Sequence, residues 1–478
     1  MSKSLKIILF AIGGLVGLLV LISLVLIFFV DAGVYKPRLE RAASEALGME
    51  VHVGGRLGIA FFPDLRVRLD DLQVRNRGVD VASAKEAKLE IALLPLLRGE
   101  VRIVRIGLKR PRISIKRNRD GAFNFAKGQE ARGTLPARVF DNISLSDGTF
   151  LYEDERSGEG FAVENFNLDV RSLRIAGGNS PELLKNLSLT AEFACREMRT
   201  KDLAFSDVKF TCQGQEGVFA FGPVTMRLFG GQGSGDIRAD FSGPVPRYSL
   251  RSSLSKFRIE AYLKTFSSEK VAEGPMDFSA NLSLVGSSVK EIKQSAYGEV
   301  SLRGENLTLY GNDLDREFAR FESSQNFNLV DAGAFFFAGP IGLAVTKGYS
   351  FASIFRGSGG SSGIGKLFSD WQVERGTAQA KDVAMATKQN RIALKGSINF
   401  VNERFDDVTV ALIDARGCVR VQQKIRGPFR NPVVEKPSVL MSLAGPALNL
   451  LKRGRDLFTG GKCEVFYTGS VPAPERPL

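Results

Sequence analysis

The chain has 478 residues, a formal net charge of +13 and 44% hydrophobic residues, and this composition excludes a disordered or an acidic protein. Its single histidine, His52, excludes mechanisms that need two histidines and most zinc sites. No Cys-x-x-Cys pair is present for a zinc ribbon or a thioredoxin-like centre. The 50 glycines and 35 phenylalanines, against one tryptophan, favour many turns and apolar strands over a helix bundle.

The N-terminus is a short basic segment followed by a long uncharged run. Ile7 to Val30 form 24 consecutive residues without a charge, and about 20 apolar residues span a bilayer core as a helix. The run is longer than the roughly 7–15 residues of a cleavable signal peptide, and it lacks a small-x-small exit. We therefore predict a cytoplasmic segment over residues 1–6 and an uncleaved transmembrane anchor over residues 7–30. Basic residues on both sides of the run leave its orientation open on charge alone.

Beyond the anchor, the sequence predicts one short helix and then a long series of strands. The helix has Pro37 in its first turn and ends at Gly48. From Leu57 onward, apolar and polar residues alternate in many short runs separated by Gly, Asn and Asp, a pattern typical of strands with one apolar face. The helices that a parallel sheet needs after nearly every strand are missing. We therefore expect a mainly β fold, an antiparallel sheet with few short helices.

A few segments interrupt the predicted strands and divide the chain. Further helices are predicted over Asp313–Gln325, Ile364–Val373 and Leu440–Phe458. Loops are predicted over Gly128–Thr134 and Gly357–Gly365, and hairpin turns at Asp120-Gly121 and Asp147-Gly148. The resulting regions are an N-terminal β region (31–127), a central β region (128–299), a C-terminal region (300–470) and a disordered proline-rich tail (471–478).

Motifs for catalysis or nucleotide binding are incomplete. Gly360-x4-Gly365-Lys366 is similar to a phosphate-binding loop, but Leu367 replaces the hydroxyl residue that binds magnesium, so a flexible Gly/Ser loop is favoured. Some carboxylates lie close enough in sequence to be considered for acid–base catalysis, but roles in turns and helix caps explain them better. These carboxylates are Asp147, Glu153, Asp154, Asp313 and Asp315. The single histidine does not indicate a serine–histidine–aspartate catalytic triad. We expect no enzymatic activity, no metal and no cofactor.

Basic residues gather between Arg98 and Arg119, where nine Lys or Arg accompany a single acid. They alternate with aliphatic residues, so they occupy one face of strands, and no aromatic residues are interleaved for stacking on bases. No nucleic acid is therefore expected as a partner. Close to a membrane anchor, anionic lipid headgroups are the better electrostatic partner for these residues: Arg102, Arg105, Lys109 and Arg110. The alternative is a solvated polar face that protects an edge strand.

Several blocks of the sequence resemble the AsmA family. The anchor and then GMEVHVGGRLGIAFFPDLRVRLDDLQVRN, RIGLKRPRISIKRNRDGAFNF and ISLSDGTFLYEDERSG resemble its N-terminal region. GENLTLYGNDLDREFARF, DARGCVRVQQKIRGPFRNPVVEKPSV and KCEVFYTGSV resemble its C-terminal region. The resemblance implies a single-pass protein of the Gram-negative inner membrane with the bulk of its chain in the periplasm. The wider family is similar to bridge-like lipid transporters, whose sheet curls into an elongated groove with an apolar interior.

The function implied by this resemblance is a role in outer-membrane biogenesis, through phospholipid transport or lipid homeostasis between the inner and outer membranes. A protein of the outer membrane or periplasm would be a further partner. The alternative is a periplasmic scaffold that influences outer-membrane protein assembly by protein contacts. Apolar residues spaced two or four apart on the central strands are the candidates for lining a groove: Leu168, Val170, Leu187, Leu189, Phe193, Phe219 and Phe221. Alternation by itself is equally compatible with a sandwich, in which these residues would form a dry core.

The periplasm implied by the resemblance is an oxidising compartment, in which disulfides persist. Cys418 and Cys463 both lie in blocks that resemble the C-terminal region of the family, and we predict that they pair. Cys195 and Cys212 lie at the ends of neighbouring strand-like runs and are predicted as a second bridge. Four free buried thiols are the alternative.

Overall fold

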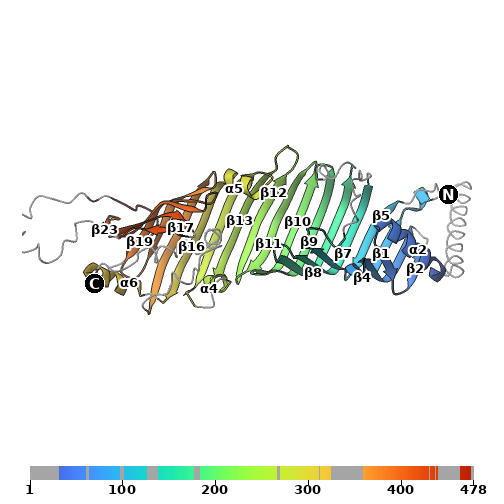
Figure 1. Ribbon diagram of the computed structural model, residues 1–478, viewed down its shortest axis with the longest axis horizontal. Helices are drawn as coiled ribbons and strands as arrows, with labels where there is room; N and C mark the ends of the chain where they lie inside the picture. The colour runs from blue at the N-terminus through green and yellow to red at the C-terminus, as the bar shows by residue number, and fades with distance from the viewer. Residues whose placement is uncertain are drawn as a thin grey trace, which may run out of the picture. The chain divides into compact units, whose positions relative to one another are not determined.

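The computed structural model describes most of the chain beyond the predicted anchor. The described residues are 32–60, 64–96, 102–125, 138–176, 184–265, 270–311, 313–324, 359–429, 431–436, 438–439, 463 and 465–474. The chain divides into two compact units, Met1–Met226 (unit 1) and Arg227–Leu478 (unit 2) (Figure 1). The anchor predicted at residues 7–30 lies outside the described residues, and within them no helix has the length and apolar character to cross a membrane.

Unit 1 is built almost entirely from strands. Its described helices are α2 (Ala32–Leu47) and α3 (Leu93–Leu96). Helix α2 confirms the predicted short helix that ends before Gly48, but Pro37 lies inside it and not in its first turn. Its strands are β1 (Glu50–Val53), β2 (Leu57–Ala60), β3 (Leu65–Asn76), β4 (Val79–Ile91), β5 (Ile103–Lys109), β6 (Arg112–Arg117), β7 (Arg138–Asp154), β8 (Glu159–Ile175), β9 (Leu187–Thr200) and β10 (Ala204–Gln215). Strand β11 (Val218–Leu228) begins in unit 1 and ends in unit 2.

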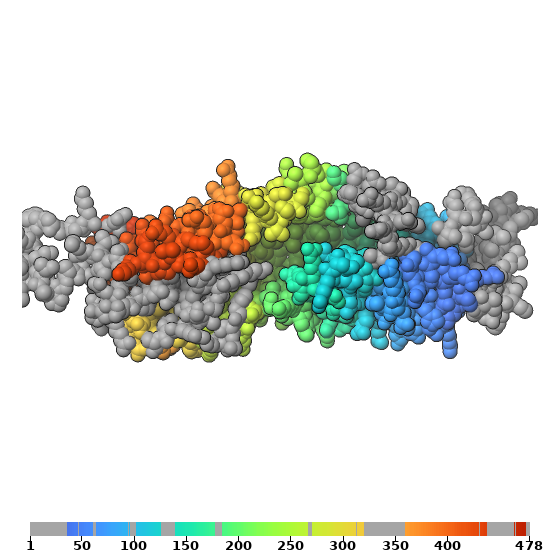
Figure 2. All heavy atoms as spheres, viewed as in Figure 1, coloured from blue at the N-terminus to red at the C-terminus, as the bar shows by residue number. Residues whose placement is uncertain are grey.

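The curled sheet of unit 1 is mixed. β3 pairs antiparallel with β1, β2 and β4, and β7 to β10 follow one another as antiparallel neighbours. β5 and β6 pair antiparallel with β4 but parallel with β7. The prediction of an antiparallel sheet is wrong at this point, because β7 begins beside the start of β5 rather than beside the end of β6. In Figure 2 the first strands of unit 1 are coloured blue to cyan and its last strands green.

Helix α2 covers the edge of β1 with its side chains. Glu40 Oε1 accepts the main-chain N–H of Val53 at 2.7 Å, and Ser44 Oγ accepts that of Val51 at 2.9 Å. Helix residues four apart rise about 6 Å and strand residues two apart about 6.6 Å, so the two repeats stay matched. The helix thereby satisfies edge groups that an uncovered strand would offer to another chain.

The alternation of apolar side chains changes phase once along most strands of unit 1. In β3, Leu69 and Leu72 are three residues apart, and between them Asp71 has φ +54°. Residues with φ between 50° and 55° also lie within β7, β8 and β10 and between β5 and β6: Asp147, Asn165, Asp207 and Arg110. Each one skips a step of the alternation, so the apolar residues on both sides of it reach the same face. Asp and Asn adopt this left-handed backbone more readily than other non-glycine residues.

One of these positions corrects a predicted turn. Asp147-Gly148 is not a hairpin turn, because β7 runs through it as a single strand of 17 residues. The left-handed Asp147 bends the strand without reversing it. The other predicted turn is confirmed, since Gly121 N–H donates to the carbonyl oxygen of Asn118 at 2.9 Å.

Unit 2 contains three short helices and a sheet of antiparallel strands among its described residues. The helices are α4 (Ile259–Leu263), α5 (Val289–Ser295) and α6 (Leu314–Ser324). The strands are β12 (Gly231–Asp240), β13 (Arg247–Arg258), β14 (Ala272–Glu273), β15 (Pro275–Val285), β16 (Tyr297–Tyr310), β17 (Ser361–Glu374), β18 (Thr377–Ala386), β19 (Arg391–Asn399), β20 (Arg404–Ile413), β21 (Val419–Pro428), β22 (Val433–Val434) and β23 (Ser438–Val439). The boundary predicted between residues 299 and 300 falls inside β16.

A closed core fills the inward face of β16 to β21. Trp371 is 1% exposed, and Leu367, Ile392 and Val410 are fully buried. Leu314 of helix α6 belongs to the same cluster. Helix α6 confirms the prediction of a helix over Asp313–Gln325.

The predicted helix over Ile364–Val373 is wrong, because these residues lie in strand β17. Ile364 and Leu367 are three apart and both buried, a spacing that also suits a helix. Here it arises from a change of phase beside Asn306 in β16, which has φ +54°. The phosphate-loop-like segment at Gly360 leads into this strand and opens no helix. The helix predicted over Leu440–Phe458 and the loop over Gly128–Thr134 lie outside the described residues.

The C-terminal segment is tied to the sheet of unit 2. Cys418 and Cys463 form a disulfide with Cα atoms 5.6 Å apart, which confirms that prediction. The prediction of a disordered tail from residue 471 is wrong at its start, since Val471 is fully buried in a second apolar cluster. Residues 471–474 are held there because the disulfide places the segment against an apolar face that Val471 covers.

The bent position in β7 gives a stability prediction. Replacing Asp147 by Val should lower the free energy of unfolding by about 1–2 kcal/mol, because a β-branched side chain disfavours positive φ. Asp147→Gly should cause no loss, and Ser146→Val, at the preceding extended position, is the matched control. Denaturant unfolding of the three variants measures the difference. Equal stability of Asp147→Val and Ser146→Val would contradict the role of the left-handed residue.

Candidate functional site

Three rows of apolar residues run across the strands on one face of unit 1. Within each row, the residues are direct Cα partners from strand to strand. The first row is Leu57, Leu69, Ala87, Leu108, Leu145, Leu168, Phe193 and Phe210. The second is Ile59, Val67, Leu89, Ile106, Ile143, Val170, Ala191 and Cys212. The third is Val51, Val74, Ala82, Ile113, Phe150, Val163, Met198 and Phe205. At about 4.8 Å between strands, each row is about 34 Å long.

The three rows remain largely half-buried. The ring of Phe193 stacks on those of Phe210 and Phe166, with centroids 4.8 Å and 6.3 Å away, and still keeps part of its surface accessible. In the described part of unit 1, all strands belong to one sheet, and no second sheet covers the rows. A sandwich would bury such residues between two inner faces, so the sandwich alternative does not describe this unit.

Five of the predicted groove residues lie on β8 and β9. Leu168, Val170 and Phe193 belong to the first two rows. Leu187 and Leu189 precede the second-row residue of β9 at two-residue steps, so they share its face. All five are half-buried. The structure thus brings them onto one apolar face, and their contact with lipid remains a prediction.

The other two predicted residues, Phe219 and Phe221, lie on β11. Phe221 contacts Phe210 of the first row edge-on, with ring centroids 5.9 Å apart. Phe219 is 6% exposed, and its ring lies over Gly214, where a Cβ would be only 2.6 Å away. Sequence reasoning missed most members of the rows, because strand register decides them. The available signal was the odd spacing of apolar residues around single Asp or Asn residues.

Cys195 and Cys212 are free and buried, so the predicted second disulfide is wrong. Cys195 is the Cα partner of Val208 and Cys212 that of Ala191, so the two thiols are four residues apart along their strands. That offset is about 13 Å, whereas a disulfide needs Cα atoms within about 7 Å. Burial raises the pKa of both thiols, which keeps them protonated and unreactive at neutral pH.

The opposite face of unit 1 carries paired charges. Arg68 Nη2 lies 2.6 Å from Glu86 Oε2, and Arg105 Nη1 lies 3.0 Å from Glu90 Oε2. Exposed pairs of this kind contribute at most about 1 kcal/mol each, but they keep the face hydrated. The sheet of unit 1 therefore has one wet face and one apolar face.

The four predicted headgroup residues are all exposed in unit 1. Arg105 is held by Glu90 on the charged face. Among the described residues, no acidic side chain lies within 4.0 Å of the charged groups of Arg102, Lys109 or Arg110. These three cations are available to an external anion, and their contact with headgroups remains a prediction.

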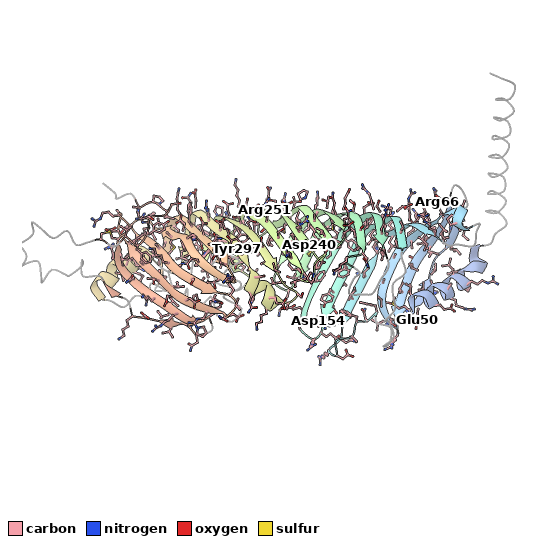
Figure 3. All side chains as sticks on the ribbon, turned by 90° about the horizontal axis from the view of Figure 1, so that it is seen from above. Glu50, Arg66, Asp154, Asp240, Arg251 and Tyr297 are labelled. Atoms are coloured by element: carbon pink, nitrogen blue, oxygen red, sulfur yellow. A yellow bond between two sulfur atoms is a disulfide. The ribbon has the colours of Figure 1, made fainter. Side chains whose placement is uncertain are left out.

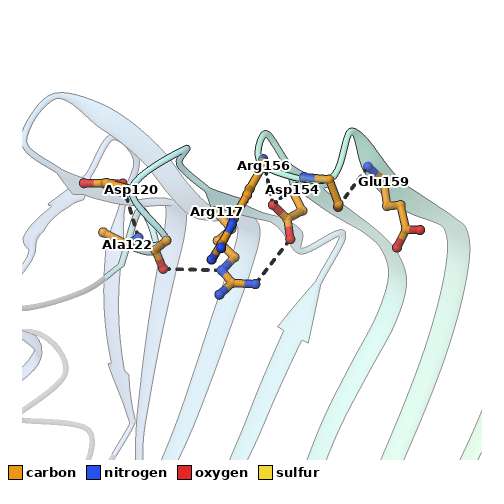
Figure 4. A network of polar contacts seen from close by, with 8 residues as sticks. Arg117, Asp120, Ala122, Asp154, Arg156 and Glu159 are labelled. Carbon is orange, nitrogen blue, oxygen red and sulfur yellow. Dashed lines mark hydrogen bonds and ion pairs between the residues drawn. The ribbon is translucent and has the colours of Figure 1, made fainter. Parts of the chain in front are cut away.

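Two of the carboxylates weighed for catalysis, Asp154 and Asp313, take part in a turn and a helix cap. Asp154 Oδ1 accepts the main-chain N–H of Arg156 at 2.9 Å, and Oδ2 lies 3.4 Å from Arg117 Nη1 (Figure 4). The Arg156 N–H and the Arg117 guanidinium hold the pKa of Asp154 below its usual range. Asp154 lies at the opposite margin of unit 1 from Arg66 (Figure 3). Asp313 accepts a main-chain N–H of α6 at 3.1 Å, as a helix cap does.

The buried thiols give a chemical prediction. The native chain should react with no maleimide at pH 7, because burial keeps Cys195 and Cys212 protonated and inaccessible. After unfolding without reductant, two thiols per chain should react, both mapping to these positions. Mass spectrometry of the labelled peptides measures this. Labelling of Cys418 or Cys463 in unreduced protein would contradict the assignment.

The comparison with family models gives a match. The model of the AsmA family matches residues 1–183 and 182–324, which together are more than half of the chain. The blocks with Cys418 and Cys463 lie beyond these matches. A comparison with curated proteins finds no match. The family is associated with the cell envelope and outer-membrane biogenesis. With its N-terminal two thirds matched and its mainly β architecture, the chain belongs to the AsmA family.

Proposed function

We propose that this chain is a single-pass inner-membrane protein whose periplasmic body carries phospholipid between the inner and outer membranes along an apolar groove. The observation that carries the lipid part is the set of three apolar rows in unit 1, which each cross eight strands and are largely half-buried. Contiguous apolar surface that is only partly covered over this extent normally serves a ligand or a partner. Family membership supports the envelope role.

The direction of the rows suits an acyl chain. Each row is perpendicular to the strands, so an extended chain lying along it would contact one side chain from every strand over about 34 Å. Each CH₂ group taken out of water by this contact contributes about 0.8 kcal/mol. The charged face on the other side of the sheet stays in water. Burial alone can therefore balance extraction of a lipid from a bilayer, and we propose that the protein works without covalent chemistry.

Headgroups of such lipids carry phosphate, and the exposed cations of unit 1 are suitable partners for it. Lys109 and Arg110 lie at the β5–β6 junction, and Arg102 directly precedes β5. A basic residue close to an anionic membrane surface contributes about 1 kcal/mol to binding. We propose that these residues attract headgroups while the acyl chains contact the rows.

A charge placed on the apolar face tests this function. In Leu189→Asp the carboxylate should stay hydrated at the half-buried position, so the body should remain folded while acyl chains are repelled. The matched control is Thr190→Asp, the next residue of β9, which faces the charged side. We expect crosslinking of phospholipid to a photoreactive residue at Phe193 to fall about fivefold or more in Leu189→Asp only. Protease resistance of the body checks the fold in both variants.

Two results would contradict the proposal. A folded Leu189→Asp chain with undiminished crosslinking and full envelope function would remove the groove mechanism. Absence of any phospholipid crosslink in the unmodified chain would instead favour the scaffold role, in which envelope function depends on protein contacts.

A further inference from the structure

Residues 465–474, which we call the clasp, lie against the outward face of β18, β19 and β20 in unit 2. The strand residues under the clasp are apolar, mostly small and 0–7% exposed: Ala384, Ala386, Ala393, Ala411 and Ile413. Their sequence neighbours Met385 and Leu412 belong to the inward core, so this set faces the other way. Tyr467 and Val471 of the clasp pack on this face and are 8% and 0% exposed.

The face under the clasp differs from outward faces elsewhere in unit 2. Arg303 on β16 pairs with Asp370 on β17 at 2.7 Å, as is usual for a surface in contact with water. Under the clasp, by contrast, alanines are Cα partners across three strands: Ala384, Ala393 and Ala411. Small apolar residues in register give a smooth surface, onto which an extended segment with large side chains of its own can pack.

Polar contacts fix the position of the clasp on this face. The Tyr467 hydroxyl donates to Asp382 Oδ1, and Ser470 N–H donates to Asp382 Oδ2 at 2.9 Å. Val471 N–H donates to the hydroxyl oxygen of Tyr467 at 3.0 Å. A Cβ on Gly469 would lie 2.2 Å from Asp382 Oδ1, so a larger residue does not fit there. The face thus recognises a tyrosine, a glycine two residues later and an aliphatic residue four residues later.

The clasp also encloses a charge without an acidic partner among the described residues. Arg391, 7% exposed, donates to the carbonyl oxygens of Val471, Asp414 and Ala415 at 2.9, 3.0 and 3.2 Å. Its guanidinium lies 5.5 Å from the Tyr467 ring centroid, and its Nε has no hydrogen-bond partner. A buried charge without a counter-ion is unfavourable, and departure of the clasp would return this one to water. Displacement of the clasp is therefore less costly than its buried contacts alone suggest.

The disulfide keeps the clasp beside its site. Within the described residues of the clasp, the only strand pairing is an isolated bridge between Val465 and Cys418. The Cys418–Cys463 bond supplies a covalent tether, which gives the clasp an effective concentration in the millimolar range. At this effective concentration, a segment with only modest intrinsic affinity for the face of β18–β20 stays bound to it.

We propose that the outward face of β18–β20 is a peptide-binding site that the clasp occupies in this structure. Its partner would be an extended segment of another protein with the same pattern of tyrosine, glycine and aliphatic residue. Asp382 would accept the tyrosine hydroxyl, and Arg391 would bind a main-chain carbonyl, as both do with the clasp. This inference does not rest on lipid handling, since it concerns the face opposite to the apolar core of unit 2.

The test uses the full chain in detergent with the clasp released by Cys463→Ser and Gly469→Ala. The first change removes the disulfide tether and leaves the clasp joined to the sheet by the main chain alone, and the second places a methyl group against Asp382 without altering the strands. The ligand is a fluorescent peptide of residues 463–474 with Ser at position 463. The control peptide carries Gly469→Ala as well. Fluorescence anisotropy measures binding, and protease resistance of the body checks the fold.

We expect saturable binding of the peptide to the released chain, with about tenfold weaker binding of the control peptide and of the peptide to the unmodified chain. Adding Asp382→Ala to the released chain should abolish binding, while Asp406→Ala, outside the face on β20, should leave it unchanged. Equal or absent binding of both peptides to a folded released chain would overturn the proposal. Loss of protease resistance on release would also overturn it, because the clasp would then be part of the fold rather than a displaceable ligand.

Discussion

Successive side chains of a strand point to opposite faces, and the whole of unit 1 depends on how this alternation is reset where the strands bend. A strand that bends without a reset would move its remaining apolar residues to the wet face. Asp71, Asp147 and Asn165 prevent this by taking left-handed backbone conformations in three different strands. The apolar residues before and after each bend therefore contribute to the same face, and the rows continue from strand to strand. An unfavourable φ at each bend costs free energy, and the burial of apolar side chains along the continuous rows offsets this cost.

The two units use their apolar faces differently. In unit 1 the rows are half-buried and all described strands belong to one sheet, so part of the apolar surface remains available to a ligand. In unit 2 the inward face of β16 to β21 is filled by its own side chains, including Trp371 and the α6 residue Leu314. The same alternation thus produces an open surface in one unit and a packed core in the other. The difference lies in what covers the sheet, not in the strand pattern.

Surfaces that would otherwise attract other chains are covered by segments of the chain itself. Helix α2 satisfies edge groups of β1 through Glu40 and Ser44, which removes a site for strand addition. The clasp covers the alanine face of β18–β20 and is tied there by a disulfide. Helix α2 follows the repeat of the strand that it covers, so another chain finds few free edge groups there. The second encloses Arg391, whose guanidinium has no acidic partner among the described residues, and we propose that a similar segment can replace it.

Sequence patterns were sufficient to predict the mainly β architecture and the short helices α2 and α6, and family resemblance was sufficient to predict the pairing of Cys418 with Cys463. Local alternation and capping residues are sufficient for the elements, because they act over a few neighbouring residues. Strand register is a long-range property, and only the tertiary structure decided it. Register places Cys195 opposite Val208 and so separates it from Cys212, and it aligns Leu168 with Phe193 and Phe210 in one row. Local signals were ambiguous for the same reason: the Asp147-Gly148 pair indicated a turn and the segment around Leu367 a helix, whereas pairing with the neighbouring strands places both of them inside strands.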